Sequence, residues 1–422
     1  MAKKRVLKFQ IFMNNPKNQK SFVTIAILVA ALGYFVDIYD LLLFGIIRVP
    51  SLKALGLSEA DVLIAGESII SWQMIGLLLG GIIWGVMGDK KGRLSVLFGS
   101  ILLYSLANIA NGFVQTVEQY KYIRFIAGLG LAGELGAGIT LVAELVSQQK
   151  RGIATSMVAG IGLSGAVFAF FIKQHFDWRT CYFIGGGMGI LLLLLRVSVF
   201  ESNLFTKSKN SEIKRGDFFM LLTNRIRLKK YLLNILIGLP TWLIIGILVT
   251  FSKEFGEHMN LSEPIDPGKA IMYAYVAISI GDIMIGFISH WLKSRKKAMY
   301  IFYGITIIFL TLYFTILWNS NANTMYFVCA GLGFGTGFWA IFVTTAAEQF
   351  GTNLRATATT TIPNMVRGML AIFILPTFKF FRGFTDFYQA GLITSVIIMI
   401  LATGALYFIE ETFDKNLDFI EE

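Results

Sequence analysis

Apolar segments long enough to cross a membrane recur along the whole chain. A transmembrane helix needs about 20 mostly apolar residues to traverse the hydrocarbon core of a bilayer. We therefore predict an all-α membrane protein whose helices are these segments. The sequence contains twelve of them, placed to within about three residues: 23–47, 62–87, 94–113, 120–145, 152–172, 181–200, 231–251, 267–292, 298–318, 324–347, 356–378 and 387–408.

The basic residues lie mainly on one side of these predicted spans. If both termini are cytoplasmic, the tails and cytoplasmic loops hold 25 of the 37 Lys and Arg residues, and the external loops hold 9. This bias is the positive-inside signal, so we predict cytoplasmic termini. The net charge of +11 is thereby explained without a nucleic-acid partner. The lipid bilayer is the partner that the charge pattern predicts.

Short motifs recur at nearly equal separation along the chain. Ala-Gly-Leu-Gly occurs at residues 127–130 in the fourth span and again at 330–333 in the tenth. Ala-Glu occurs at 143–144 and again at 347–348, and in both copies an arginine follows the glutamate by seven residues. Matches in equivalent spans indicate two six-helix bundles related as parallel repeats. In such folds the substrate site lies near the midplane between the halves, which move around it.

A polar segment separates the sixth and seventh spans. It carries eight Lys and Arg residues and is too polar to cross the membrane. We therefore predict three parts: an N-terminal bundle at 1–200, a cytoplasmic loop at 201–230 and a C-terminal bundle at 231–422.

Several motifs resemble those of the major facilitator superfamily. The loop after the second span reads Gly85-Val-Met-Gly-Asp89-Lys-Lys-Gly-Arg93, which is similar to the superfamily's loop signature. Arg124-Phe-Ile-Ala-Gly-Leu-Gly130 resembles its fourth-helix motif. The resemblance implies the major facilitator fold, a monomer in a bacterial cytoplasmic membrane, a small-molecule substrate and no cofactor. Further motifs resemble the sugar-porter and metabolite:proton-symporter branches: Tyr39-Asp40, Glu144 with Arg151, Glu201-Ser202 and Glu410-Glu411-Thr412.

Three departures from the family pattern bear on the substrate. The second copy of the loop has His290 where the family usually has an acid. The fifth span has no Gly-Pro pair, which is the motif of drug antiporters. The proline that sugar porters carry before the Glu144 region is also absent. These differences weigh against drug export and weaken a sugar-porter interpretation.

Charged residues inside the first and fourth spans are candidates for proton coupling. A charge at bilayer depth costs roughly 2.5–3.5 kcal/mol on insertion scales, so it needs a partner or a wet cavity. Asp37 and Asp40 are three residues apart and share a helix face. The resemblance to sugar porters implies that Asp40 and Arg124 form the proton-coupling pair. The alternative is a permanent ion pair that only serves packing.

Four other charges within predicted spans are given candidate roles. Glu134 is interpreted either as a proton relay or as a hydrogen-bonded structural acid. Asp282 is a candidate cavity residue, and Glu67, near the external end of its span, is expected to reach water. Arg367 lies where related organic-anion carriers have a substrate-binding arginine, and a guanidinium binds carboxylate in bidentate fashion. Its alternative role is pairing with Asp282 or with a helix end.

Two further groups of residues are assigned provisional roles. Charges at the cytoplasmic ends of the spans are predicted to form gating ion pairs: Asp89, Arg93, Glu144, Arg151, Glu348 and Arg355. Polar and aromatic side chains within the spans are candidates for lining the substrate cavity: Gln73, Trp242, Trp339 and Asn364.

No enzymatic site is apparent in the sequence. The three histidines, at 175, 258 and 290, have no metal-ligand spacing, and no phosphate-binding loop is present. We predict a secondary active transporter that takes up a small polar metabolite, an organic anion, with protons by alternating access. The alternatives are a proton-coupled sugar or polyol symporter and a transporter-like sensor that binds its ligand without moving it.

Overall fold

The structure, a computed structural model, describes residues 16–91, 93–134, 148–200, 218–351 and 353–415. All regular secondary structure in these residues is helical. Nine of the described helices are long and apolar enough to cross a membrane, and Ser95–Asn111 forms a shorter apolar helix. The prediction of an all-α membrane protein is confirmed.

Six helices precede residue 201 in the described part of the chain, and the fourth of them, α5, covers only the first part of the predicted fourth span. The rest of the predicted fourth span, from 135 to 145, lies outside the described residues. The helices are α2 (Pro16–Ala54), α3 (Glu59–Lys91), α4 (Arg93–Asn111), α5 (Val117–Leu131), α7 (Gln148–His175) and α8 (Trp178–Phe200).

The second group of helices follows the predicted linker, and three of its spans are interrupted. The elements are α9 (Phe218–Thr223), α10 (Arg225–Leu243), η1 (Ile244–Val249), α11 (Ser252–His258), α12 (Pro267–Leu292), α13 (Arg295–Tyr313), α14 (Ala322–Thr336), α15 (Trp339–Glu348), α16 (Arg355–Met369), η2 (Leu370–Ile374), α17 (Leu375–Arg382) and α18 (Phe387–Phe408). The seventh predicted span is α10 with η1, the tenth is α14 with α15, and the eleventh is α16, η2 and α17. Within the described residues, each of the twelve predicted spans therefore coincides with a helix or a run of helices, the fourth only over its first part.

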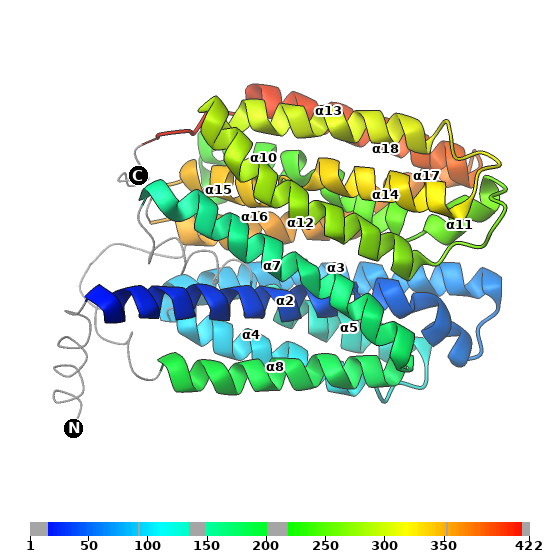
Figure 1. The fold of residues 1–422 in the computed structure, drawn as a ribbon, viewed down its shortest axis with the longest axis horizontal. Coiled ribbons are helices and arrows are strands. Elements are labelled where there is room, and N and C mark those ends of the chain that lie inside the picture. The colour runs from blue at the N-terminus through cyan, green and yellow to red at the C-terminus, as the bar shows by residue number, and fades with distance from the viewer. Residues whose placement is uncertain (1–15, 92, 135–147, 201–217, 352, 416–422) are drawn as a thin grey trace.

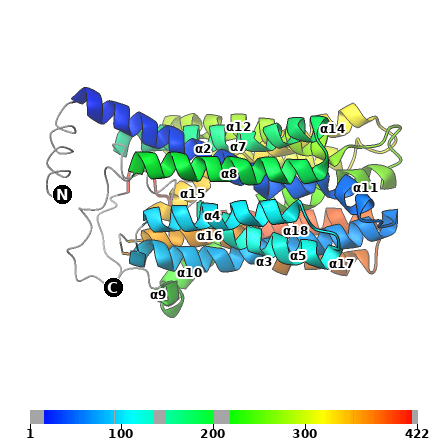
Figure 2. The same ribbon diagram turned by 90° about the horizontal axis from the view of Figure 1, so that it is seen from below.

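The two groups of helices form two bodies that lie side by side. Figure 1 shows α2–α8 in one body and α10–α18 in the other, with the long axes of the helices roughly parallel. Figure 2 shows two seams between the bodies, one where α7 lies beside α12 and one where α3 lies beside α16. We call the two bodies the N-terminal half and the C-terminal half.

The interruptions in the C-terminal half fall at different depths: η1 ends its span, Arg225–Val249, whereas η2 and the break between α14 and α15 lie inside theirs. The π-helical turns η1 and η2 contact each other, because Gly246 packs against the Leu370 side chain. Single π-turns inside α-helices occur often at functional sites. The break between α14 and α15 falls at Gly337, whose backbone approaches Gly281 of α12 so closely that a Cβ at either position would overlap the other's backbone.

Candidate functional site

The Asp40 carboxylate and the Arg124 guanidinium form a fully buried ion pair inside the N-terminal half. Arg124 Nη1 donates to Asp40 Oδ1 at 2.8 Å, and Nη2 donates to the Asp40 carbonyl oxygen at 3.0 Å. Arg124 Nε donates to Gln73 Oε1 at 3.2 Å, and Nη1 is 3.4 Å from Asn108 Oδ1. Gln73 is itself fixed by donating to the Leu41 carbonyl at 3.0 Å. The predicted Asp40–Arg124 contact is therefore present, and four acceptors hold the guanidinium.

A second ion pair, between Asp37 and Arg367, joins the two halves. Arg367 Nη2 of α16 lies 3.8 Å from Asp37 Oδ2 of α2, and the two side chains are 1% and 0% exposed. Arg367 Nη1 is 3.5 Å from Asn364 Oδ1, and the guanidinium lies 6.0 Å from the centre of the Trp339 ring. Neither Asp37 oxygen nor Arg367 Nε has a hydrogen-bond partner among the described residues. The pair is close, but its hydrogen-bonding capacity is largely unused.

Asp282 does not pair with Arg367, contrary to one of the alternatives from the sequence. Asp282 Oδ1 instead accepts a hydrogen bond of 2.9 Å from the Ala340 backbone N–H. Ala340 lies in the first turn of α15, where backbone N–H groups lack intrahelical partners. The Gly281–Gly337 contact brings α12 close enough for Asp282 to cap this helix from a neighbouring span. Its second oxygen, Oδ2, has no hydrogen-bond partner in the described part of the chain.

Glu134 forms a third buried ion pair, with Arg196 of α8. Arg196 Nη1 lies 2.9 Å from Glu134 Oε2, and Arg196 Nη2 contacts Glu134 Oε1. Gly33 of α2 makes room for the pair, because a Cβ there would overlap both charged groups. The arrangement supports the structural role for Glu134, and a role in proton transfer stays a prediction. Arg196 is visible in the sequence as an arginine within a span, but its partner is not.

A small pocket opens between the halves beside these pairs. Gln73 of α3 and Trp242 of α10, both predicted cavity residues, line it. The other two predicted cavity residues, Asn364 and Trp339, lie beside Arg367. The Nε1 groups of Trp242 and Trp339 have no acceptor among the described residues. The remaining lining residues come from α2, α3, η1, η2 and the segment after η1: Leu41, Leu42, Phe44, Gly45, Ile70, Met74, Ile245, Gly246, Thr250 and Leu370.

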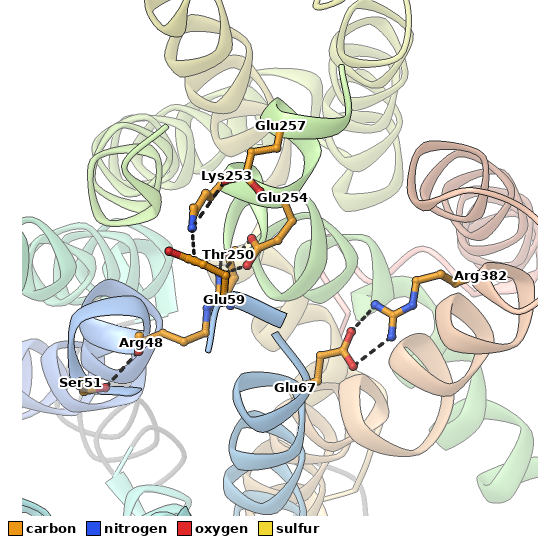
Figure 3. A network of polar contacts seen from close by, with 9 residues as sticks. All are labelled: Arg48, Ser51, Glu59, Glu67, Thr250, Lys253, Glu254, Glu257 and Arg382. Carbon is orange, nitrogen blue, oxygen red and sulfur yellow. Dashed lines mark hydrogen bonds and ion pairs between the residues drawn. The ribbon is translucent and has the colours of Figure 1, made fainter. Parts of the chain in front are cut away.

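Ion pairs between the halves also cluster at the end of the molecule that carries α11. Arg48, fully buried at the end of α2, donates from Nη2 to both Glu254 oxygens at 2.7 and 3.0 Å, and its guanidinium lies 4.7 Å from the centre of the Phe251 ring. Lys253 contacts Glu59 at 2.9 Å (Figure 3). Lys173 and Asp266 form a further pair between the halves at 2.8 Å. We call these pairs, together with the contacts of Glu67 described next, the α11-end cluster.

The expectation that Glu67 reaches water is wrong. Its side chain is 1% exposed and accepts from Arg382 Nη1 at 2.7 Å and Arg382 Nη2 at 3.2 Å (Figure 3). Lys379 Nζ also lies 3.0 Å from Glu67 Oε2. Both cations belong to α17 in the C-terminal half. Glu67 is buried because these two side chains cover it, and a single span gives no sign of that contact.

The predicted gating residues are only partly described. Glu144 and the side chains of Asp89, Arg93 and Arg151 lie outside the described residues. Glu348 is described and pairs with Arg295 of the same half at 3.1 Å. Arg355 donates from Nε to the Ala347 carbonyl at 3.2 Å. The gating assignments stay predictions.

The C-terminal motif is fixed to the same face as Glu348. Thr412 donates its hydroxyl to Glu348 Oε2 at 2.6 Å. Glu411 accepts from the Arg295 backbone N–H at 2.9 Å and from the Ser294 hydroxyl, so it caps α13. Partial burial opposes ionisation of Glu411, but these hydrogen bonds outweigh it and hold the pKa of this carboxyl below its usual value.

Comparison with known proteins agrees with the helical architecture and identifies the family. The model of the Major Facilitator Superfamily matches residues 24–376. The chain therefore belongs to the major facilitator superfamily. It is a multi-pass membrane transporter and not an enzyme.

Two curated relatives match over nearly their whole length. The niacin transporter NiaP of Acinetobacter baylyi is 26% identical over 93% of this chain and 95% of its own length. The sialic acid transporter NanX of Escherichia coli is 26% identical over 95% of both chains. Among solved structures, the proton:xylose symporter XylE bound to 6-bromo-6-deoxy-D-glucose superposes with a TM-score of 0.67 and 15% identity, covering 94% of this chain and 98% of that one. This last likeness concerns the fold.

Proposed function

We propose that the protein is a proton-coupled symporter of a small organic anion that carries a carboxylate. The observation that supports this most strongly is Arg367. Its guanidinium is 1% exposed, lies at the junction of the two halves and has an Nε without a hydrogen-bond partner among the described residues. A buried cation with free donors at the junction of two moving halves is suited to receive an anion.

The chemistry of the neighbouring groups supports a carboxylate. Guanidinium presents two parallel N–H groups that match the two oxygens of a carboxylate. Trp339 and Asn364 lie next to Arg367, so a bound acid would meet an aromatic face and an amide. Niacin and sialic acid, named for the two full-length relatives, are both carboxylic acids. The two share little else, so the acid group is the feature on which a common cation would act.

Alternating access is consistent with the α11-end cluster. At that end charged side chains of one half contact those of the other at 2.7 to 3.0 Å, so the described residues close it. Under the orientation predicted from the Lys and Arg bias, this is the external end. Rocking of the halves would separate these pairs and open the site to the outside.

The predicted residues that lie around the junction of the halves then have a place in the proposed cycle. Arg367 binds the substrate anion. Asp37 and Asp40 supply the candidate proton site, each with its own arginine. The remaining predicted residues surround the junction between the halves: Asn364, Trp339, Trp242, Gln73 and Asp282.

Uptake into proteoliposomes tests this proposal. We expect labelled nicotinate or sialic acid to accumulate when the lumen is made alkaline. A monoanion carried with one proton moves no net charge, so an imposed voltage of 100 mV, about 2.3 kcal/mol per elementary charge, should not drive it. Voltage-driven uptake of xylose would instead support the sugar alternative. Binding of an acid without uptake would support the sensor. If the protein neither binds nor takes up nicotinate, sialic acid or xylose, the proposal is contradicted.

A further inference from the structure

The ion pair between the halves is incomplete in a way that leaves room for a third partner. Asp37 meets Arg367 through one oxygen at 3.8 Å, which is too long for a hydrogen bond. Both Asp37 oxygens and Arg367 Nε are buried without hydrogen-bond partners in the described residues. Buried polar atoms are nearly always satisfied in folded proteins. Here the unpaired atoms lie on both members of a pair that makes no hydrogen bond between its two side chains, so a third partner can bind there.

A substrate carboxylate would occupy the same cation that Asp37 now faces. The Nε–Nη edge of a guanidinium accepts one carboxylate in bidentate fashion. Once the substrate takes this edge, Arg367 no longer compensates the charge of Asp37. A carboxylate that is fully buried and unpaired becomes neutral by binding a proton.

We propose that Asp37 and the substrate carboxylate compete for Arg367, and that Asp37 takes up one proton from the aqueous side each time the substrate displaces it. This inference rests on the proposed function. It adds that one proton accompanies each substrate anion and that Asp37 is the residue that binds this proton. The charges balance at every stage. The empty site holds Asp37 as an anion beside the Arg367 cation, and the loaded site holds neutral Asp37 with the cation and one substrate anion.

Proton and substrate transport are coupled because only the empty and the fully loaded site are electrically neutral. The empty carrier is neutral at this site and can return with the ion pair closed. The fully loaded carrier is neutral too, because one proton accompanies one monoanion. Substrate without the proton would leave a bare carboxylate at Asp37 in a buried site, which is strongly disfavoured. The two cargoes therefore cross together.

Other charged and titratable groups around Asp37 already have partners or different roles. Asp40, on the same helix, is held by Arg124, and Glu134 is held by Arg196. Asp282 interacts electrostatically with Tyr34, as Asp37 does, and its Oδ1 accepts a hydrogen bond from the Ala340 N–H. Among the described residues, Arg367 is the only cation within 4 Å of the Asp37 carboxylate. The ionisable hydroxyls facing this region belong to Tyr34, Tyr104 and Tyr275.

Proton uptake on substrate binding tests the inference directly. Purified full-length protein in weak buffer is mixed with nicotinate while a pH-sensitive dye reports released or bound protons. We expect close to one proton taken up per nicotinate bound at neutral pH. Nicotinamide, the neutral analogue of nicotinate, should cause no uptake. Glu118→Gln, on an exposed surface pair with Lys121, serves as the control variant and should match the parent.

Substitutions at the two neighbouring acids locate the proton. In Asp37→Asn the uptake should disappear, nicotinate affinity should rise several-fold, and that affinity should no longer change with pH. Asp37→Glu keeps the acid and should restore proton uptake. Asp40→Asn, the comparison variant, should still take up a proton if it folds. In the parent protein, an infrared difference spectrum should show a carboxylic-acid carbonyl band appearing with nicotinate, a readout that needs no substitution.

The outcomes separate this inference from the proposed function. Nicotinate binding without proton uptake, or uptake lost in Asp40→Asn but kept in Asp37→Asn, overturns the competition at Asp37 and leaves the anion transporter standing. Failure of both nicotinate and sialic acid to bind overturns both. Weaker nicotinate binding in Asp37→Asn would also contradict competition, because removal of a competitor cannot lower affinity.

Discussion

Two arginine–aspartate pairs lie one helical turn apart on α2, and they differ in almost every respect except composition. Arg124 and Asp40 belong to the same half and share four acceptor contacts between 2.8 and 3.4 Å. Arg367 and Asp37 belong to different halves and meet once at 3.8 Å. A pair embedded in one rigid body can keep its hydrogen bonds in every state of the transporter. A pair that spans two moving bodies must be able to separate.

The difference indicates that burial alone does not reveal which charges change during function. All four side chains are at most 1% exposed. What distinguishes them is how many hydrogen bonds each would lose if its partner left. By that measure Arg124 is an anchor within the N-terminal half, whereas Arg367 has few hydrogen bonds to lose, as our proposal of anion exchange requires.

The largest expected effect is on stability at the anchored pair. Arg124→Gln removes the cation that Asp40, Gln73 and Asn108 share, and breaking a buried pair by removing one partner costs about 3–5 kcal/mol. Arg367→Gln should cost far less, because its pair is loose and Asp37 can neutralise itself. Thermal unfolding of both variants in detergent checks this. Equal loss of stability in the two would remove the distinction.

The Glu134–Arg196 pair should behave as an anchor of the same kind. Gly33→Ala places a methyl group where both charged groups lie, and overpacking of this type costs about 1–3 kcal/mol. The control is Gly187→Ala on α8, where a Cβ would meet no atom within 4 Å. We expect Gly33→Ala to lower the unfolding temperature and Gly187→Ala to leave it unchanged. If Gly33→Ala does not change the unfolding temperature, the Glu134–Arg196 pair can move aside and is not an anchor.

Ligand affinity should depend on the exchangeable pair. Arg367→Lys keeps the charge but loses the bidentate fork, so nicotinate affinity should fall about tenfold, which corresponds to roughly 1.4 kcal/mol. Equilibrium binding of labelled nicotinate measures the change. Unchanged affinity in both Arg367→Lys and Arg367→Ala would exclude this arginine from the site.

The smallest expected effect lies at the exposed edge of the α11-end cluster. The Glu59 side chain is 62% exposed, and exposed ion pairs contribute about 0–1 kcal/mol. Glu59→Gln should therefore barely change stability. Glu67→Gln leaves Arg382 and Lys379 facing a neutral group at a buried position and should cost more. Double-mutant cycles with Arg382 and with Lys253 would measure both pairs, and a larger value for the Glu59 pair would contradict the role of burial.

The sequence predicted the fold because span length and charge placement are local properties. It also located Asp37, Asp40, Arg124 and Arg367, since a charge in an apolar segment is conspicuous by itself. The Asp40–Arg124 contact followed from the family resemblance. Substrate and proton roles for these residues remain proposals.

Contacts between distant spans were beyond the sequence. Arg367 meets Asp37 and not Asp282, because packing of the two halves along the α7–α12 and α3–α16 seams decides which side chains face each other. Glu67 is buried by Arg382, more than 300 residues later in the chain. Arg196 carried the right signal, a charge at depth, but nothing in the sequence pointed to Glu134 as its partner.

Closure of the α11 end by charges rather than by apolar side chains has a consequence for how the transporter responds to temperature. Opening that end returns Arg48, Glu254 and Glu67 to water. Hydration of charged groups becomes less favourable on warming, because it carries a strongly negative entropy. Heating should therefore shift the resting carrier toward the state that is closed at this end, and cooling should favour opening. Distances between spin labels on α11 and the α2–α3 turn, followed across temperature, would show this shift as a growing short-distance population.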